Sequence, residues 1–155
     1  DELYDSSKGS PLVRINDLVL HATRFSFTVL GQVERCTFKR RDRKGKRSNL
    51  PMGFPGLACR HCQGAFGRSG RYFPTSIKTI SDTKKTLMPI YYHLSQCEAC
   101  PTSVSHLLDR YFICHNEERV SKARGSQRAF FRLVWGRLHN LESEVNSTKD
   151  QSSQS

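Results

Sequence analysis

Four residues in this chain have the types and the spacing to bind one metal ion: Cys59, Cys62, His93 and Cys97. The first two form a C-x2-C sequence and the last two an H-x3-C sequence, so each pair comes from one short stretch of backbone. Two such pairs, separated by a longer connection, supply the tetrahedral set of thiolate and imidazole ligands that zinc prefers. The spacing therefore predicts one zinc site with four protein ligands.

Two alternatives to this ligand set remain open. Cys97 and Cys100 form a second C-x2-C sequence, which makes Cys100 an alternative to His93. We favour His93 because residues four apart lie on one face of a helix, whereas Pro101 places Cys100 beyond the helix end. A second zinc site is the weaker alternative, and its ligands would be Cys100, His106, Cys114 and His115.

The predicted ligand set favours a structural metal over a catalytic one. Catalytic zinc keeps one coordination position open for water or substrate, whereas four protein ligands fill a tetrahedral site. The sequence contains no H-E-x-x-H, no G-x-S-x-G and no combined H-x-E and P-C-x-x-C pattern of the zinc deaminases. We therefore expect a binding protein and not an enzyme.

The elements that would position the ligands are mainly helices. Apolar periodicity predicts a helix over 16–33, although residues 25–29 also alternate as a strand would. A short strand is expected at 71–73, before Pro74. The metal-bearing helix would run from Ser81 or Asp82 to about Cys97, with Pro89 either kinking it or marking its true start. Two further helices are predicted over 103–118 and 126–144.

These elements predict an α+β fold with one zinc-stabilised domain over 12–139. Its centre would be a small zinc finger of knuckle, strand and helix over 53–101, and the other helices would flank it. Gly64, two residues after Cys62, suits the tight turn of a metal knuckle. His61 is expected to point away from the metal and to be exposed. Residues 1–11 are expected to be flexible, and the Ser- and Gln-rich residues 146–155 disordered.

The charge of the chain favours a polyanionic partner, either nucleic acid or an anionic membrane surface. The 155 residues include 25 Lys and Arg against 14 Asp and Glu, for a net charge of +11. Residues 39–47 hold seven basic residues and one acid, and they are predicted to form a loop.

No stretch approaches the roughly 20 apolar residues of a membrane span. The absence of a signal pattern and the C-x2-C spacing favour a reducing compartment, and a chain that begins at Asp1 is expected to be a fragment.

The leading functional hypothesis is a nucleic-acid-binding module in the nucleus that acts on duplex DNA more readily than on RNA. The candidate contacts are the cations of 39–47, those around the knuckle and those of a basic linker: Lys39, Arg40, Arg41, Arg43, Lys44, Lys46, Arg47, Arg60, Arg68, Arg71, Lys122 and Arg124. The rival interpretation of each cluster is an ordinary solvated surface. The alternative function is a protein-interaction scaffold, which would dock through the C-terminal helix with Phe130, Phe131 and Trp135. For these aromatic residues themselves, ordinary core packing is the favoured interpretation.

Several motifs between residues 33 and 139 resemble a known group of proteins. They are Gly53-Phe54-Pro55-Gly56-Leu57, Cys59-Arg60-His61-Cys62, Gly70-Arg71-Tyr72-Phe73-Pro74, Ser81-Asp82-Thr83, His93, Cys97-Glu98-Ala99-Cys100-Pro101, and Arg128, Phe130, Phe131, Trp135, Arg137, Leu138 and His139. The chain resembles an uncharacterised family of microbial-algal proteins with a single BED-like zinc finger. The resemblance implies the zinc ligands, and it implies DNA binding by analogy with BED-type fingers. Two features depart from BED-type fingers: the aromatic residues near the start match loosely, and Pro89 interrupts the metal-bearing helix.

Overall fold

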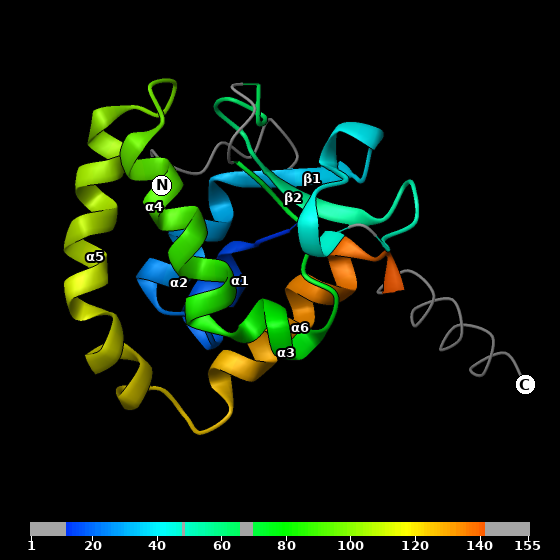
Figure 1. Cartoon of the computed structure of the whole chain (residues 1–155). Helices are drawn as coiled ribbons and strands as arrows, with labels where there is room; N and C mark the ends of the chain where they lie inside the picture. The colour runs from blue at the N-terminus through cyan, green and yellow to red at the C-terminus, as the bar shows by residue number, and fades with distance from the viewer. Residues whose placement is uncertain (1–11, 48, 66–69, 142–155) are drawn as a thin grey trace, which may run out of the picture.

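A computed structural model describes residues 12–47, 49–65 and 70–141, and Figure 1 shows its architecture. The helices α1 and α2 lead into strand β1, and two short 3-10 helices, η2 and η3, follow it. Strands β2 and β3 precede the remaining helices. The bounds are α1 Ile15–Leu20, α2 Arg24–Gly31, β1 Val33–Thr37, η2 Arg40–Asp42, η3 Gly45–Arg47, β2 Pro55–Cys59, β3 Arg71–Tyr72, α3 Ile77–Ser81, η4 Thr83–Leu87, α4 Met88–Gln96, α5 Thr102–Ser121 and α6 Ser126–Leu138.

The predictions for the two chain ends, 1–11 and 146–155, lie outside the described residues. So do residues 142–144 of the last predicted helix. Within the described part, α6 ends at Leu138, and Asn140 takes a positive φ of 60°. A left-handed residue at this position is a common helix stop, which explains why the periodic pattern overran the end of α6. The preceding helix is longer than predicted, since α5 covers Thr102–Ser121 in place of 103–118.

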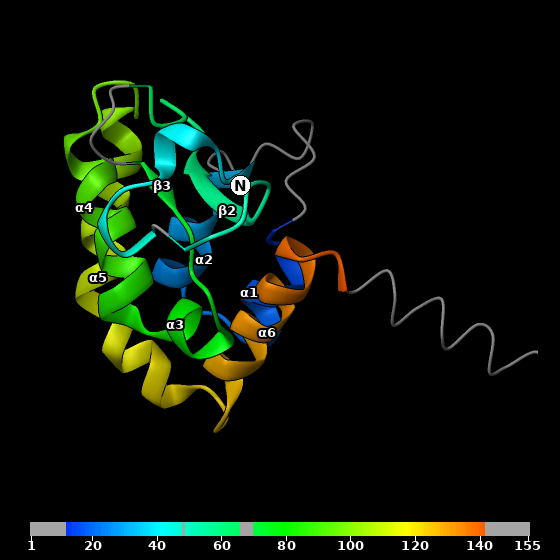
Figure 2. The same ribbon diagram turned by 45° about the vertical axis from the view of Figure 1, so that its right-hand side comes forward.

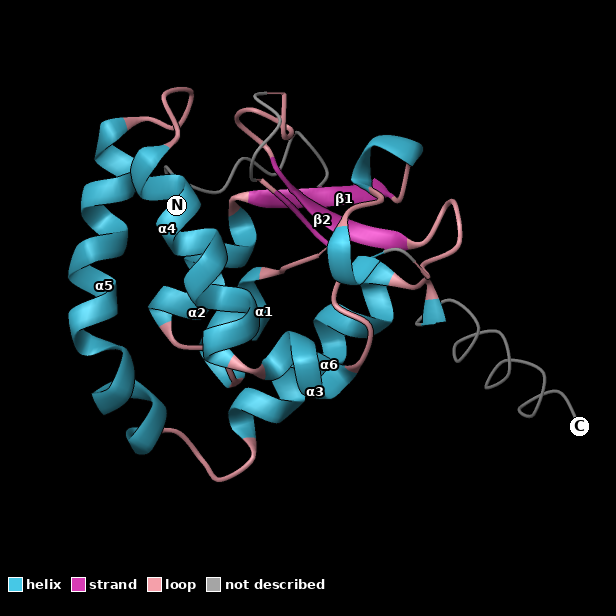
Figure 3. Ribbon diagram, in the orientation of Figure 1, coloured by secondary structure: helices cyan, strands magenta, loops and turns pink. Residues whose placement is uncertain are grey.

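The three strands form one antiparallel sheet in the order β1-β2-β3, which confirms the α+β class. Val33 pairs with Cys59, and Leu57 pairs with Tyr72. Figure 3 shows the sheet on one side of the molecule and the helices around the rest. The short strand predicted at 71–73 is confirmed as β3, whereas β1 and β2 were not predicted.

Strand β2 was missed because its sequence, PGLAC, resembles a turn. Glycine is nevertheless required in it, since a Cβ at Gly56 would lie 2.4 Å from the Phe73 ring and 2.6 Å from the Tyr72 carbonyl oxygen. A side chain at position 56 would therefore push β3 and the residue after it away from β2. Pro55 pairs with Thr37 at the end of the strand, where a missing N–H disturbs the ladder least.

The single helix predicted over 16–33 is wrong, because the chain forms α1, α2 and the start of β1 there. Thr23 ends the first segment and caps the second, since its hydroxyl oxygen accepts a hydrogen bond from the Ser26 N–H at 3.0 Å. Phe25, Val29 and Val33, three of the apolar residues that recur at helical spacing, are all buried. They reach the core from two different elements, so their helical spacing is partly coincidental.

The metal-bearing helix also differs from the prediction, because α3, η4 and α4 replace one continuous helix. Asp82 separates the first two, and its carboxylate accepts hydrogen bonds from the N–H groups of Lys84 and Lys85 at 2.9 and 3.2 Å. The π-helical turn η4 then leads directly into α4. Pro89 is the second residue of α4, where a proline is well tolerated, so of the two predicted roles it marks the start of the helix.

The core lies between the helices and one face of the sheet. Phe25 of α2 contacts Tyr91 of α4 and His115 of α5, with ring centroids 5.2 and 5.1 Å apart. The helix α2 packs against α5, and α3 packs against α6. Figure 2 shows α1 and α6 together on the side of the molecule away from α4 and α5. None of the helices in the described residues is long and apolar enough to cross a membrane.

Candidate metal centre

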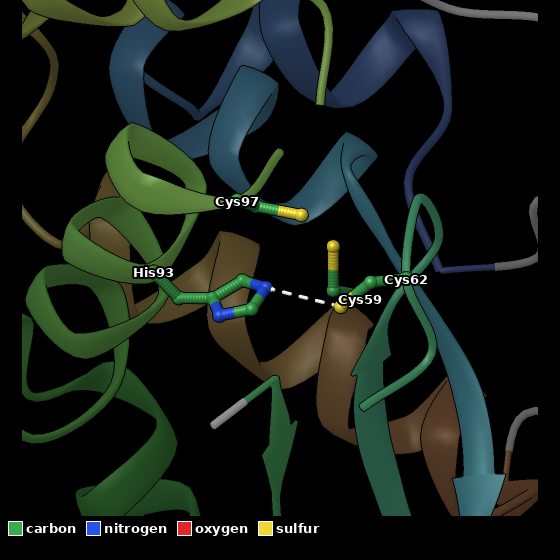
Figure 4. A group of neighbouring side chains, drawn as sticks. All are labelled: Cys59, Cys62, His93 and Cys97. Atoms are coloured by element: carbon green, nitrogen blue, oxygen red, sulfur yellow. Dashed lines mark hydrogen bonds between the residues drawn. The ribbon is translucent and has the colours of Figure 1, made fainter. Parts of the chain in front are cut away.

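The four predicted ligands converge at one point between the sheet and α4 (Figure 4). Their sulfur and nitrogen atoms all lie within 4.8 Å of one another, and Cys62 Sγ is 3.4 Å from His93 Nε2. Zinc–sulfur bonds of about 2.3 Å and zinc–nitrogen bonds of about 2.0 Å place the ligands of a tetrahedral ion about 3.5–3.8 Å apart. The cluster of Cys59, Cys62, His93 and Cys97 could therefore hold a metal ion with small adjustments.

Each ligand sits at the end of an element or in a tight turn. Cys59 is the last residue of β2, and Cys62 follows in the turn after it. His93 lies in the last turn of α4, which ends at Gln96. Cys97 is therefore not on the helix face as predicted but one residue past it, with an extended ψ of 116°. Its side chain still points into the cluster (Figure 4).

The turn after β2 has the backbone arrangement of a metal knuckle. The N–H groups of His61 and Cys62 donate to the sulfur of Cys59. The Gly64 N–H donates to Cys62 Sγ over 3.4 Å. Gln63 and Gly64 both have a positive φ, 54° and 76°, which turns the chain sharply enough to aim these donors. Such N–H groups stabilise negative charge on sulfur, as a thiolate ligand requires.

Gly70 completes the wall of the site, a role that sequence reasoning missed. Its N-terminal neighbours are outside the described residues, but its own φ is +102°, and its carbonyl accepts the Cys59 N–H at 2.7 Å. A Cβ at this position would lie 3.1 Å from His93 Cε1 and 3.4 Å from Cys62 Sγ. One sequence signal could have revealed this role: Gly70 comes directly before β3, and β3 pairs with β2, the strand that ends in Cys59.

Burial makes the cluster unfavourable for charge in the absence of a cation. Burial raises the pKa of the Cys59 thiol to about 12, although the backbone N–H donors act in the opposite direction. Burial lowers the pKa of His93, so its imidazole is neutral near pH 7 with a lone pair available. A divalent cation would stabilise the buried thiolates, and three sulfurs with one imidazole are a donor set typical of structural zinc.

Cys100 lies outside this cluster. It is buried, and its thiol donates to the Pro101 carbonyl at 3.7 Å. The alternative second site is not assembled either: His106 is exposed on α5, and His115 Nδ1 is 2.8 Å from the Thr23 hydroxyl. Within residues 12–47, 49–65 and 70–141, one group of three or more potential ligands is found, and it is the predicted one. All six cysteines are free of disulfides.

His61 is not part of the cluster, and it is half-buried and not exposed as predicted. Its Nε2 lies 2.9 Å from the side-chain oxygen of Gln32. The neighbouring Arg60 is also half-buried, and its guanidinium donates to the Gly31 carbonyl at 3.1 Å. These two side chains attach the knuckle to the end of α2, so the metal centre and the helical part of the molecule are joined here.

The basic segment 39–47 is folded around two buried anchors. Phe38 is 1% exposed, and Asp42, the single acid of the segment, is 4% exposed. Asp42 caps η2 by accepting the Lys39 N–H at 2.9 Å, and it accepts two hydrogen bonds from Arg71 at 2.7 and 2.9 Å. The exposed cations of the segment are Lys39, Arg40, Arg41, Arg43 and Lys44, which we call the η2 surface. The predicted loop is thus two 3-10 helices held in place.

The prediction that Arg71 contacts nucleic acid is wrong, because its side chain is buried. It is 9% exposed, and the hydrogen bonds from its guanidinium to Asp42 raise its pKa further. A third bond joins it to the Thr37 carbonyl at 3.0 Å, so its charge is neutralised inside the protein. Arg47 is half-buried and donates to the Arg71 carbonyl at 2.7 Å. Arg68 and the side chain of Lys46 lie outside what the structure describes.

The second predicted cluster lies between α5 and α6. Arg124 is exposed there, and Lys122 is half-buried with its Nζ 3.3 Å from the Leu18 carbonyl. Both line an open hollow of about 510 Å³. Figure 1 shows that this connection, drawn in yellow to orange, is at the opposite end of the molecule from the cyan segment that carries the η2 surface. The two clusters do not form one continuous surface.

The C-terminal aromatic residues cannot form the predicted docking surface. Phe130 and Phe131 are 0% and 1% exposed, and their rings pack against each other in the core. Trp135 is half-buried and stacks on His139, with ring centroids 4.0 Å apart. The apolar stripe of α6 is therefore core packing, which is the interpretation favoured from the sequence.

Comparisons with known proteins do not add a relative. No family model matches the chain, and no curated protein or solved structure is similar to it. The resemblance to BED-like fingers therefore stays a prediction. The metal cluster and the charged surfaces are the features of the molecule that bear on its function.

Proposed function

We propose that the protein is a zinc-stabilised module that binds nucleic acid, with duplex DNA as its target. The observation that carries the proposal is the η2 surface, on which five exposed cations are held by a buried framework. A flexible basic tail would need to be ordered on binding, whereas a folded surface presents its charges at fixed positions. This arrangement favours contact with the regular phosphate array of a duplex.

The metal cluster supports this proposal through its position. The η2 surface follows β1, and β1 pairs with β2, which ends in the ligand Cys59. Arg71 links the same parts, because it belongs to β3 and binds Asp42 of η2. Zinc held by four protein ligands has no position open for a substrate, so its role would be to fix the sheet on which the basic segment rests. We therefore propose a structural zinc and no catalytic activity.

A nuclear location belongs to the same proposal. The composition of 39–47 is that of a basic signal for nuclear import as well as of a phosphate-binding patch. We do not propose a protein interaction through α6, because Phe130 and Phe131 of that helix are buried.

The test is a titration of the purified protein against a random duplex, a single-stranded RNA and anionic vesicles at two salt concentrations. If each of the five exposed cations contacts one phosphate, the slope of log K against log salt is about −4.5. The affinity for duplex would then fall roughly 500-fold between about 50 and 200 mM salt. A similar slope with vesicles and none with duplex would select a membrane surface as the partner.

The variant that isolates the η2 surface is Arg40→Gln/Arg41→Gln/Lys44→Gln. It leaves Arg43 in place because that guanidinium stacks on Phe38 and donates to the Leu50 carbonyl. The matched control removes three exposed cations elsewhere: Lys84→Gln/Lys85→Gln/Arg110→Gln. The first variant should reduce the slope by about 2.7, and the control should leave it close to that of the wild type. Equal effects would mean that net charge, not the η2 surface, is responsible.

A further inference from the structure

The connection between α5 and α6 carries a second, separate concentration of positive charge. Four cations line the open hollow there, and none of its lining residues is acidic; we call them the linker surface: Arg119, Lys122, Arg124 and Arg128. The three arginines are exposed. The nearest acid along the chain, Glu118, is already engaged, since its carboxylate accepts hydrogen bonds from the backbone and side chain of Arg24.

Hydrogen bonds and a tight turn fix the backbone around the hollow. Lys122 donates to the Leu18 carbonyl at 3.3 Å, which fixes the end of α5 against α1. Gly125 takes a φ of 86°, and the Ser126 N–H donates to the Ala123 carbonyl at 3.0 Å, so the chain turns sharply into α6. The arginines therefore project from a defined turn, and a flexible linker is not needed to explain their exposure.

The linker surface and the η2 surface lie at opposite ends of the molecule. Figures 1 and 2 both show the cyan segment beside the sheet at one end and the yellow-to-orange connection at the other, with α3 and α6 between them. A straight duplex could not follow both surfaces. Bending a site of 20–30 base pairs around the protein would cost about 1–6 kcal/mol, which a few exposed arginines recover only in part.

We propose that the two surfaces bind two separate duplex segments, so that one protein molecule bridges them. This inference rests on the proposed function, because it assigns the first duplex to the η2 surface. The recognition at the linker surface is electrostatic and directed to phosphates, so it is independent of base sequence. Arg132, exposed one helical turn beyond Arg128, extends the same surface along α6.

The test uses a biotinylated duplex on beads, the intact protein, and a second duplex with a fluorescent label. The wild-type chain should retain the labelled duplex on the beads. Arg124→Gln/Arg128→Gln removes two proposed phosphate contacts and should weaken binding of the second duplex roughly 60-fold at about 0.1 M salt. The matched control Lys84→Gln/Arg110→Gln removes the same charge away from both surfaces and should retain the label as the wild type does.

A parallel measurement of binding to one duplex at low protein concentration separates the outcomes. Loss of bridging in Arg124→Gln/Arg128→Gln with single-duplex affinity close to wild type supports the inference. Intact single-duplex binding without bridging by the wild-type chain overturns the inference and leaves the proposed function standing. Bridging that survives in this variant overturns it too, because the second duplex would then be held by association of two protein molecules. No duplex binding at all contradicts both proposals.

Discussion

The two ends of this molecule are held together in different ways. At the sheet end, where the strands have two to five residues, β2 and the turn after it supply Cys59 and Cys62 to the cluster, and α4 and the residue after it supply His93 and Cys97. At the helical end, longer helices bury large apolar side chains such as Phe25 and Phe130. The short strands offer few residues to a core of their own, and we propose that a metal ion bound by the four residues takes the place of apolar packing there.

The two ends also treat buried charge differently. In the helical part, Asp17 of α1 and Arg137 of α6 form a two-pronged ion pair at 2.6 and 3.1 Å, with both side chains about 5% exposed or less. In the sheet part, the Asp42–Arg71 pair connects η2 to β3 beside the metal cluster. The Asp17–Arg137 pair joins two helices, α1 and α6, that also pack in the apolar core. The Asp42–Arg71 pair instead holds the η2 surface against the sheet. The difference predicts that damage at one end leaves the other largely intact.

The largest effect is expected from loss of a metal ligand. Cys62→Ala should remove most of the metal's contribution to folding, which is on the order of 10 kcal/mol in small zinc domains. Cys36→Ala is the matched control, because that thiol is half-buried in β1 and outside the cluster; it should cost about 1 kcal/mol. Urea unfolding of both variants, followed by circular dichroism, measures the difference. Equal losses would contradict the ligand assignment.

Next in size is the buried ion pair of the helical end. Arg137→Met leaves the Asp17 carboxylate buried without its guanidinium partner and should reduce the free energy of unfolding by about 3–5 kcal/mol. Asp17→Leu/Arg137→Met removes both charges and should recover much of this loss. The metal content, measured by elemental analysis, should stay at the wild-type value in both variants. Loss of metal in Arg137→Met would show that the two ends are not independent.

A smaller effect is expected at Gly70, whose backbone is left-handed. Gly70→Ala should cost about 1–2 kcal/mol because of the backbone strain. It should also weaken metal retention, because the new methyl group would press on His93 and Cys62. Gly136→Ala in α6 is the control, since nothing lies within 4 Å of its added Cβ and helix propensity favours alanine. Competition with a chromogenic chelator compares the two; equal retention would remove Gly70 from the wall of the site.

The smallest effect on stability is expected from the η2 surface. Arg40→Gln/Arg41→Gln/Lys44→Gln changes exposed side chains only, so its free energy of unfolding should stay within about 0.5 kcal/mol of the wild type. Its zinc content should be unchanged. Thermal unfolding of this variant beside the wild-type protein provides the check. A large loss of stability would mean that these cations are part of the fold and not a surface for a partner.

The sequence predicted the site better than the fold around it. The C-x2-C and H-x3-C motifs are defined by local spacing in the sequence. They can therefore be recognised even when the helices and strands around them are predicted incorrectly. The predicted ligand Cys97 shows this, because it lies past the end of α4 and still reaches the cluster. The α+β class was predicted as well, although with one strand in place of three.

What the sequence could not predict depends on contacts between distant segments. Strand β2 begins with Pro55 and Gly56, and the need for that glycine lies in Phe73, far along the chain. Arg71 has the same charge as Arg40, yet it is buried because Asp42 folds back onto it. The one indication of this burial in the sequence is the position of Asp42, the single acid within the basic residues 39–47. The break at Thr23 was hidden because the buried residues on both sides share a helical spacing.

We propose that Cys59, Cys62, His93 and Cys97 together hold one zinc ion. The most direct measurement is native mass spectrometry of the protein, purified without chelator, combined with elemental analysis of the same sample. We predict one zinc per chain in the wild-type protein and in Cys100→Ala, and none in Cys62→Ala or His93→Ala. A wild-type chain without metal, or zinc that is retained by His93→Ala and lost from Cys100→Ala, would contradict it.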